Sequence, residues 1–355
     1  MKAAVYYGPG RVQVEQVDEP GPAGPGDVVI QVQMGALCGT DASQFKQATM
    51  VPLTRPHPAS GHVGPVILGH EVVGVVVDKG PDVTQLEIGA RVVPGAGMWC
   101  GTCPQCRQGR TNICQQAYLF GIHAHGGLAE RATFPAKMCL PVPVGCPTEA
   151  AVMAQPCAVA LHALRRGGIT PAQTVALFGV GSIGSLLLAA MQARAGGSQH
   201  VIAVDVERGR LETARRLGAA SLVDARSDDP VAAVCELTGG AGVDLAIDAT
   251  GVPATIAQAL ASVRRGGRLL QVGIPLQAVS LALDQAVQQE KDMVTTNGQV
   301  CAVDLPQALE LLATTDLAAR VGYQVIELDA LVQEGLVPLA EQRARAKVLV
   351  ALSGA

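Results

Sequence analysis

Four cysteines lie close together in the stretch WCGTCPQCRQGRTNIC, residues 99–114, with the spacing C-x2-C-x2-C-x7-C. They are Cys100, Cys103, Cys106 and Cys114. In a reducing compartment, cysteines at such spacing are more often metal ligands than disulfide partners. A tetrahedral zinc ion held by four thiolates has no position left for water or substrate. We therefore expect a structural zinc loop, at about 95–115, that takes no direct part in catalysis.

An iron–sulfur cluster and a set of free thiols are the alternatives for this loop. The spacing C-x2-C-x2-C also opens ferredoxin-type motifs. Here a basic and polar segment, RQGRTNI, precedes the fourth cysteine, and no Cys-Pro pair follows it. The sequence therefore favours zinc.

A second group of potential ligands lies in GALCGTD, residues 35–41, and LGHEVVG, residues 68–74. Cys38, His70 and Glu71 supply a thiolate, an imidazole and a carboxylate, which are the ligand types of catalytic zinc sites with an open position. Taken singly, each has an ordinary interpretation as a core cysteine, a strand-edge histidine or a solvated glutamate. Their combination with a zinc loop and a nucleotide motif makes a catalytic site the better hypothesis.

The nucleotide motif is GVGSIG, from Gly179 to Gly184, which follows an apolar segment and precedes an apolar helical one. In the G-x-G-x-x-G pattern the glycines permit a tight turn, close approach of a pyrophosphate and close helix packing. Ser182 and Ile183 would open the helix whose N-terminus faces the phosphates. Asp205 ends the next apolar strand, where a carboxylate accepts ribose hydroxyls and repels a 2′-phosphate, so the pattern favours NAD over NADP. Arg210 lies nearby and could pack its guanidinium on the adenine or, as the less favoured alternative, admit a 2′-phosphate.

The chain changes character twice along its length. Residues 1–157 contain many short apolar segments punctuated by glycine and proline, which is typical of an irregular β-rich domain. Residues 158–297 alternate buried strands with helices, including a helix expected over 254–265, and this predicts a doubly wound α/β sheet. Residues 298–355 are too few for a third domain, so we expect them to return to the first.

Composition narrows the class of protein. The 355 residues are 49% hydrophobic and 16% charged, with a net charge of −4 and no basic block, so nucleic acid and acidic membranes are poor partners. The apolar run 175–191 contains several glycines and serines and is short for a membrane span. The first residues, MKAAVYYGPGRVQVEQ, contain no apolar h-region or small-residue cleavage site, so we expect no secretory signal. We expect a cytoplasmic protein that acts on small molecules.

These motifs together resemble the zinc-dependent medium-chain dehydrogenase/reductase (alcohol dehydrogenase) family, over essentially the whole chain. The segments that carry the resemblance are GHEVVGVV, CGTD, the four-cysteine loop, GVGSIG and the terminal KVLVAL. The stretches VPLTRPHPASGHVGPVILGHE and CAVALHALRRGG are most similar to the 2,3-butanediol and sorbitol dehydrogenase branch. The resemblance implies a GroES-like catalytic domain, a Rossmann domain, NAD, two zinc ions and a homodimer or homotetramer formed through the Rossmann domains. It also implies conversion of a secondary alcohol, of the polyol or vicinal diol class, into its ketone.

Carried over residue by residue, the resemblance makes Cys38 and His70 zinc ligands and Glu71 either a ligand or one that exchanges with water. Relatives commonly have a further glutamate at the position of Gln155, whose neutral amide binds zinc less strongly. Thr40 matches the hydroxyl that contacts the substrate oxygen and starts a proton relay. Ser43 stands where relatives often have the histidine that ends this relay.

The remaining expectations concern the surroundings of the site. We expect Thr250 and the segment Val272, Gly273 and Ile274 to line the nicotinamide pocket, because they follow predicted parallel strands. The histidines of the stretch 44–65 are expected to be exposed loop residues. Because Gln155 and Ser43 weaken the site, an NAD-binding scaffold or sensor stays an alternative, as does a biosynthetic ketone or aldehyde reductase.

Overall fold

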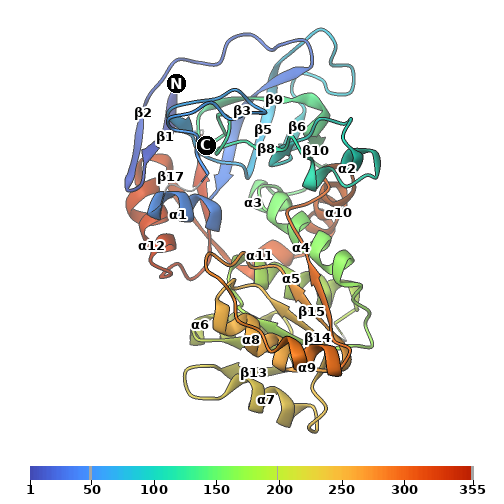
Figure 1. Ribbon diagram of the computed structural model, residues 1–355. Helices are drawn as coiled ribbons and strands as arrows, with labels where there is room; N and C mark the ends of the chain where they lie inside the picture. Colours follow the sequence, from blue (N-terminus) through green and yellow to red (C-terminus); the bar gives the residue numbers. More distant parts are fainter. Residues whose placement is uncertain (48–49, 198, 353–355) are drawn as a thin grey trace. The chain divides into compact units, whose positions relative to one another are not determined.

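The chain forms two compact units in a computed structural model that describes residues 1–47, 50–197 and 199–352. The first unit combines Met1–Ala158 with Gln299–Ala355, and the second is Val159–Gly298. The last strand of the chain, β18 (Lys347–Ala351), pairs antiparallel with β3 (Asp27–Ala36). The C-terminal segment, red in Figure 1, therefore completes the unit that the blue N-terminal segment begins.

A mixed sheet is the centre of the first unit. Its strand order is β10-β6-β5-β3-β18-β17, and β9 also pairs with β3. The further strands of this sheet are β5 (Val72–Lys79), β6 (Arg91–Pro94), β9 (Arg131–Pro135), β10 (Cys139–Pro141) and β17 (Tyr323–Glu327). Two small sheets, β2-β1-β4 and β7-β8, accompany it. Their strands are β1 (Lys2–Gly8), β2 (Arg11–Gln16), β4 (Val66–Ile67), β7 (Gly97–Met98) and β8 (Tyr118–Leu119).

Mostly short helices join these strands. The α-helices are α1 (Gly39–Lys46), α2 (Pro104–Arg107), α3 (Thr148–Ala151), α4 (Ala154–Gly167), α10 (Cys301–Thr314), α11 (Leu317–Val321) and α12 (Val337–Ala340). Single turns of other helix types are η1 (Thr111–Ile113), η2 (Ala136–Met138), η3 (Leu328–Ala330) and η4 (Leu331–Leu336). The helix α4 runs from the first unit into the second.

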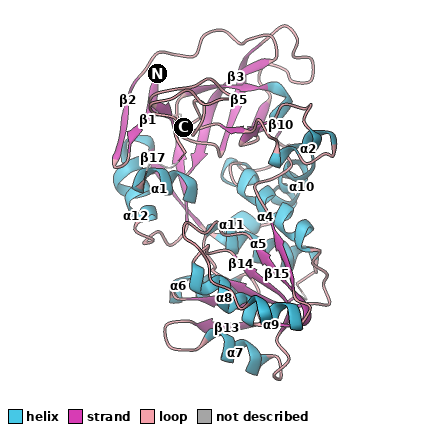
Figure 2. Ribbon diagram, viewed as in Figure 1, coloured by secondary structure: helices cyan, strands magenta, loops and turns pink. Residues whose placement is uncertain are grey.

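The second unit is a parallel sheet with the strand order β13-β12-β11-β14-β15-β16. Numbered from β11, this is the order 3-2-1-4-5-6 of the Rossmann fold. The strands are β11 (Thr174–Phe178), β12 (His200–Asp205), β13 (Ser221–Asp224), β14 (Val243–Asp248), β15 (Val263–Gln271) and β16 (Asp292–Thr295). The helices are α5 (Ser182–Arg194), α6 (Arg208–Arg216), α7 (Pro230–Leu237), α8 (Pro253–Ala261) and α9 (Leu283–Gln288), and Figure 2 shows them accompanying the magenta strands.

Hydrophobic burial explains this second sheet. The side chains of β11 after Thr174 are all apolar, as are those of β14 apart from Asp244 and Asp248. Ala176, Phe178 and Ala246 are fully buried in one core cluster. Strands covered on both faces are expected to have such continuous apolar sequences. The prediction of a doubly wound sheet is confirmed.

The expected helix over 254–265 is wrong at its C-terminal end. α8 ends at Ala261, and Val263 already pairs with Val243 in the sheet. The Lys291 amino group donates to the carbonyl oxygens of Leu260 and Ala261, which are among the carbonyls that a helix C-terminus leaves without intrahelical partners. Pairing with β14 therefore decides the structure at Val263, although the local pattern of residues favours a helix.

The apolar run 175–191 is divided between β11 and α5. Within the described ranges, the helices are too short or too polar to cross a bilayer.

Candidate metal centres and nucleotide-binding site

Two neighbouring strands of the first unit bring Cys38, His70 and Glu71 together. Cys38 follows β3 as the residue that caps α1, whereas His70 and Glu71 directly precede β5. β3 and β5 are antiparallel, with Gly35 opposite Val72, and the Ala36 N–H donates to the carbonyl oxygen of Glu71 at 2.8 Å. The end of one strand therefore lies beside the beginning of the other.

The three potential ligands have ligand atoms within 4.8 Å of one another. Glu71 is fully buried and His70 is 6% exposed. Among the described residues, Nδ1 of His70 and Oε1 of Glu71 are buried without a hydrogen-bond partner, whereas Oε2 of Glu71 faces the Lys347 amino group. Buried polar atoms without partners are costly unless something else satisfies them. A divalent cation would do so, and the thiolate, imidazole and carboxylate set fits zinc.

The electrostatics of this cluster favour a cation. Burial alone would lower the pKa of His70, but the Cys38 thiol and the Asp41 and Glu71 carboxylates outweigh it and raise the pKa to about 10. Burial has the opposite effect on the carboxyl group of Asp41 and raises its pKa, whereas the nearby His70 lowers it. The cluster therefore stabilises positive charge strongly.

Two charged residues that the sequence analysis did not select complete the cluster. The side chain of Asp41 accepts a hydrogen bond from the Cys38 N–H at 2.8 Å, and its second oxygen lies 3.8 Å from His70 Nδ1. Lys347, which begins β18, places its amino group 2.5 Å from Glu71 and donates to the Leu37 carbonyl at 2.8 Å. The CGTD motif includes Asp41 and could have indicated its role. Lys347, in contrast, differs from its neighbours in the sequence only as a charged residue at the start of an apolar strand.

The expected relay residues lie on α1. The Cys38 sulfur and the Thr40 hydroxyl are 3.6 Å apart and form a weak hydrogen bond. Ser43 follows Thr40 by three positions, so both lie on one side of the helix. Gln155, near the start of α4, is 6% exposed, and its role as a ligand stays a prediction.

The four cysteines of the 99–114 loop also converge. Their sulfur atoms lie within 4.8 Å of one another, and none of the four forms a disulfide. The Cys114 sulfur is 3.5 Å from that of Cys100 and 3.9 Å from that of Cys103. Metal–sulfur bonds of 2.3 Å in a tetrahedron separate sulfur atoms by about 3.8 Å. The geometry of the loop fits a zinc ion.

Backbone N–H groups prepare this loop for thiolates. Cys100 Sγ accepts from the N–H groups of Thr102 and Cys103, and Cys114 Sγ accepts from those of Cys100 and Gln116, all at 3.3–3.4 Å. Hydrogen bonds from Thr102 lower the pKa of Cys100 to about 6. Desolvation has the opposite effect at Cys106, where it raises the pKa to about 12. A bound cation would overcome this cost.

The glycine turn of the second unit leads from β11 into α5. Gly179 has φ +89°, and a Cβ atom on it would lie 2.6 Å from Thr250 Cγ2. A Cβ on Gly184 would lie 2.0 Å from the carbonyl oxygen of Gly179, so the helix packs against the turn as expected. Gly181, which caps α5, has open space where a side chain would be. Ser182 and Ile183 follow it with the unpaired N–H groups of a helix start, which suit a phosphate.

Asp205 ends β12 beside this turn. Its carboxylate accepts hydrogen bonds from the N–H groups of Val180 at 2.7 Å and Glu207 at 2.9 Å. Arg210 Nη1 lies 3.9 Å from the same carboxylate. The contacts of Asp205 tie the glycine turn to the region where a Rossmann fold holds the adenosine ribose.

The other expected cofactor residues follow β14 and β15. Thr250 donates to the buried carboxylate of Asp248 at 2.6 Å. Val272 and Gly273 donate their N–H groups to the carbonyl oxygen of Asp248, both at 2.9 Å. Ile274 is 72% exposed. These residues therefore share the carboxyl edge of the sheet with Gly179, because β14 and β15 are parallel to β11.

The histidines of the stretch 44–65 are not simply solvated, contrary to expectation. The His57 ring stacks on that of His123 with centroids 4.2 Å apart, and the His62 ring meets that of His125 edge-on at 4.9 Å. Burial and the neighbouring His57 lower the pKa of His123 to about 4. Ring packing between separate loops leaves no periodic signal in the sequence.

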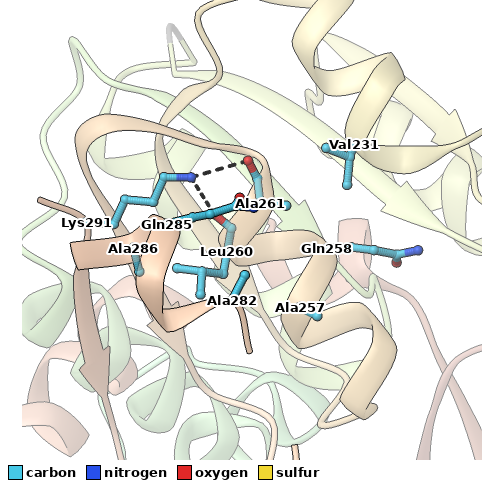
Figure 3. A pocket seen from close by; sticks show the side chains of 9 residues that line it. All are labelled: Val231, Ala257, Gln258, Leu260, Ala261, Ala282, Gln285, Ala286 and Lys291. Atoms are coloured by element: carbon cyan, nitrogen blue, oxygen red, sulfur yellow. Dashed lines mark hydrogen bonds between the residues drawn. The ribbon is translucent and has the colours of Figure 1, made fainter. Parts of the chain in front are cut away.

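One surface cavity lies among the helices of the second unit and has a volume of about 330 Å³. Figure 3 shows Lys291 at the edge of the cavity, with its amino group hydrogen-bonded to the carbonyl oxygens of Leu260 and Ala261. None of the residues that line this cavity belongs to the cofactor or metal sets, so it has no place in the chemistry described here.

A β-rich unit with two zinc-compatible clusters and a Rossmann unit with a dinucleotide turn define a class of metal-dependent dehydrogenases. Comparisons with known proteins agree. The model of the alcohol dehydrogenase GroES-like domain matches residues 24–144, and that of the zinc-binding dehydrogenase matches residues 182–314. The chain belongs to the zinc-dependent medium-chain dehydrogenase/reductase family, the alcohol dehydrogenases, and is an oxidoreductase that acts on a small molecule with zinc and a nicotinamide cofactor.

Individual relatives cover most or all of the chain. It is 30% identical to (R,R)-butanediol dehydrogenase of Bacillus subtilis, over 99% of both chains. It is 32% identical to sorbitol dehydrogenase of the same organism, over 78% of this chain and 76% of the relative.

Solved structures agree in fold. The crystal structure of 2R,3R-butanediol dehydrogenase from Bacillus subtilis has a TM-score of 0.89 at 28% identity, over 99% of both chains. A zinc-binding dehydrogenase from Sinorhizobium meliloti, solved with NADP bound, has a TM-score of 0.86 at 29% identity, over 99% of this chain and 98% of that one. The predicted family and the prediction of a GroES-like and a Rossmann domain are confirmed.

Proposed function

We propose that this dehydrogenase interconverts a secondary alcohol of the polyol or vicinal diol class with its ketone, using NAD and a zinc ion bound by Cys38, His70 and Glu71. The observation that carries the proposal is the convergence of these three ligand types in a buried cluster, where His70 Nδ1 and Glu71 Oε1 have no hydrogen-bond partner among the described residues. The butanediol and sorbitol specificities in the names of the relatives support the substrate class.

Each cluster residue has a distinct task in this proposal. Cys38 and His70 hold the ion, and Glu71 adds a carboxylate that Lys347 balances. When bound, zinc supplies a Lewis acid for the substrate oxygen, and the nicotinamide accepts or returns a hydride. The Thr40 hydroxyl accepts the proton of the substrate hydroxyl as it donates its own proton to Ser43, one turn further along α1, and the Ser43 hydroxyl in turn donates its own proton to water. Gln155 contributes a neutral amide oxygen, so less negative charge opposes the ionised alcohol.

NAD is the preferred cofactor in this proposal. The Asp205 carboxylate stands where a 2′-phosphate would bring further negative charge. Arg210 Nη1 lies 3.9 Å from the Asp205 carboxylate, so its positive charge is directed to Asp205 and is less available to a 2′-phosphate. The Gly179–Gly184 turn and α5 receive the pyrophosphate, whereas Thr250 and Val272–Ile274 face the nicotinamide.

The four-cysteine loop holds the second zinc in a structural role. All four positions of a tetrahedral ion would be occupied by Cys100, Cys103, Cys106 and Cys114. This ion orders the loop between β7 and β8 and does not meet substrate.

A homodimer or homotetramer formed through the Rossmann units completes the proposal. β16 is an edge strand of the six-stranded sheet, and its Met293 is 43% exposed. Ile274, Leu276 and Val287 nearby in sequence are 68–76% exposed. An unpaired edge with exposed apolar side chains suits pairing with a second copy. Light scattering of the Val287→Asp variant tests this, because a charge in the interface should yield monomers.

The test of the reaction is formation of NADH by zinc-loaded protein with vicinal diols, polyols and primary alcohols, and its reversal with the matching ketones and aldehydes. We expect turnover with secondary alcohols and vicinal diols, and little with primary ones. If zinc-loaded protein turns over no alcohol, ketone or aldehyde, the scaffold alternative holds instead.

A further inference from the structure

Asp248, the last residue of β14, is a fully buried carboxylate. It accepts hydrogen bonds from the Thr250 hydroxyl at 2.6 Å, the Gly251 N–H at 2.9 Å and the Gln271 side-chain amide at 2.6 Å. Within residues 1–47, 50–197 and 199–352, it has no ion pair with a lysine or arginine. A buried carboxylate without a cation depends on such donors for its stability. Thr250 and Gly251 belong to the turn that follows β14, and Gln271, the last residue of β15, leads into the turn that follows that strand.

These two turns are packed backbone against backbone. The carbonyl oxygen of Asp248 accepts from the N–H groups of Val272 and Gly273. A Cβ atom on Gly273 would lie 2.1 Å from the Gly251 nitrogen, so there is no space for a side chain between the turns. The Gln271 amide also donates to the Gly273 carbonyl at 2.6 Å. Movement of either turn therefore moves the other.

The same turns contact the phosphate turn. Thr250 Cγ2 lies 2.6 Å from the position of a Cβ on Gly179, and the Ala249 N–H donates to the Phe178 carbonyl at 2.9 Å. β11, β14 and β15 are adjacent in the sheet, and β14 and β15 can be followed side by side in Figure 2. Ligands of open parallel sheets bind at the carboxyl ends of the strands, where Asp248 stands.

We infer that Asp248, together with Gln271, is a positioning residue for the nicotinamide half of the cofactor. The inference rests on the proposed binding of NAD to this unit. Asp248 is too deeply buried to touch the cofactor. It acts by fixing the backbone at 250–251 and 271–273, so that the surface offered to the nicotinamide keeps one shape relative to the Gly179 turn.

The Asp248→Asn variant separates this role from a general contribution to folding. An asparagine amide has a single acceptor oxygen, and its NH2 group would face donors, so one or more of the three hydrogen bonds is lost. We expect affinity for NAD to fall about tenfold. Affinity for ADP-ribose, which lacks the nicotinamide ring, should stay at the wild-type value.

Asp244→Asn is the matched control. Asp244 lies in the same strand toward its opposite end, and its carboxylate likewise accepts from a backbone N–H, of Thr174 at 2.8 Å, and a side chain, Arg264 at 2.6 Å. This variant should lower stability without changing the ratio of NAD to ADP-ribose affinity.

The measurement is isothermal titration calorimetry of full-length protein with NAD and with ADP-ribose. A lower ratio of affinities in Asp248→Asn alone supports the inference. Equal losses for both ligands, or the same change in Asp244→Asn, overturn it. Gln271→Met removes one of the three donors and leaves the carboxylate. Should Asp248→Asn not fold, a smaller change of the same sign in Gln271→Met supports the inference, and an unchanged ratio overturns it. Wild-type protein that binds neither ligand contradicts the proposed function itself.

Discussion

Replacing Lys347 with methionine tests whether the buried charges around Glu71 are balanced as the structure indicates. Lys347 is 5% exposed and Glu71 is fully buried, and the two are 2.5 Å apart. Methionine keeps much of the length of the lysine side chain but removes its charge and its hydrogen bond to the Leu37 carbonyl. Glu71 would then face the buried Asp41 without its cation.

The expected cost follows from burial. Removing one partner of a buried ion pair typically destabilises a protein by about 3–5 kcal/mol, because the remaining charge stays buried without compensation. We expect this loss for the first unit of metal-free protein. With zinc bound the loss should be smaller, since the ion supplies positive charge next to Glu71.

The assay is urea unfolding of metal-free and zinc-loaded protein, followed by circular dichroism. Lys2→Met is the matched control, because Lys2 forms an ion pair with Asp329 at 2.9 Å, with side chains 38% and 69% exposed. Exposed pairs contribute less than about 1 kcal/mol. Equal effects of the two substitutions would refute the reasoning, as would a loss in Lys347→Met that zinc does not reduce.

Three further predictions concern the cofactor, the structural loop and pH. Asp205→Ser should raise the affinity for NADP relative to NAD, because it removes the carboxylate that repels the extra phosphate; an unchanged ratio of KM values would mean that Asp205 does not face the ribose. Cys106→Ser should lower the zinc content by one ion per chain and the melting temperature with it, and a variant with full zinc content contradicts the four-thiolate site. The pKa of His123 is lowered from 6.5 to about 4, so the unfolded chain takes up a proton at this residue more readily than the folded protein does. The free energy of unfolding should therefore decrease as the pH falls from about 6.5 to 4. His123→Gln should make the urea midpoint less sensitive to pH in that range, and an unchanged slope opposes this explanation.

Local sequence signals predict much of the architecture. The Gly179–Gly184 motif marks the strand-to-helix turn correctly, because φ +89° at Gly179 and the close packing at Gly184 both require glycine. Cysteine spacing likewise anticipates the convergence of the four sulfur atoms, since two-residue gaps bring thiols onto one side of a tight loop. In each case the residues that interact are close in the chain.

Contacts between residues that are far apart in the chain cannot be predicted from such local sequence signals. Lys347 is 310 positions from the Leu37 carbonyl that it contacts, and nothing in KVLVAL indicates a buried partner. The ring contacts of His57 with His123 arise from two loops that meet only in the folded chain. Local periodicity misplaces the boundary between α8 and β15, because Val263 and the arginines after it continue a helical pattern, whereas pairing with β14 decides the structure.

Metal content measured together with NAD affinity, in wild-type protein and in Cys38→Ala, tests the central claim most directly. Cys235→Ala serves as the control, because Cys235 is also half-buried but belongs to neither metal cluster. We predict two zinc ions per chain in wild type and Cys235→Ala, and one in Cys38→Ala, with turnover lost and NAD affinity retained in that variant. A Cys38→Ala protein that keeps two zinc ions and its turnover, or that loses NAD binding, would contradict the claim that Cys38 holds the catalytic metal and the Gly179 turn holds the dinucleotide.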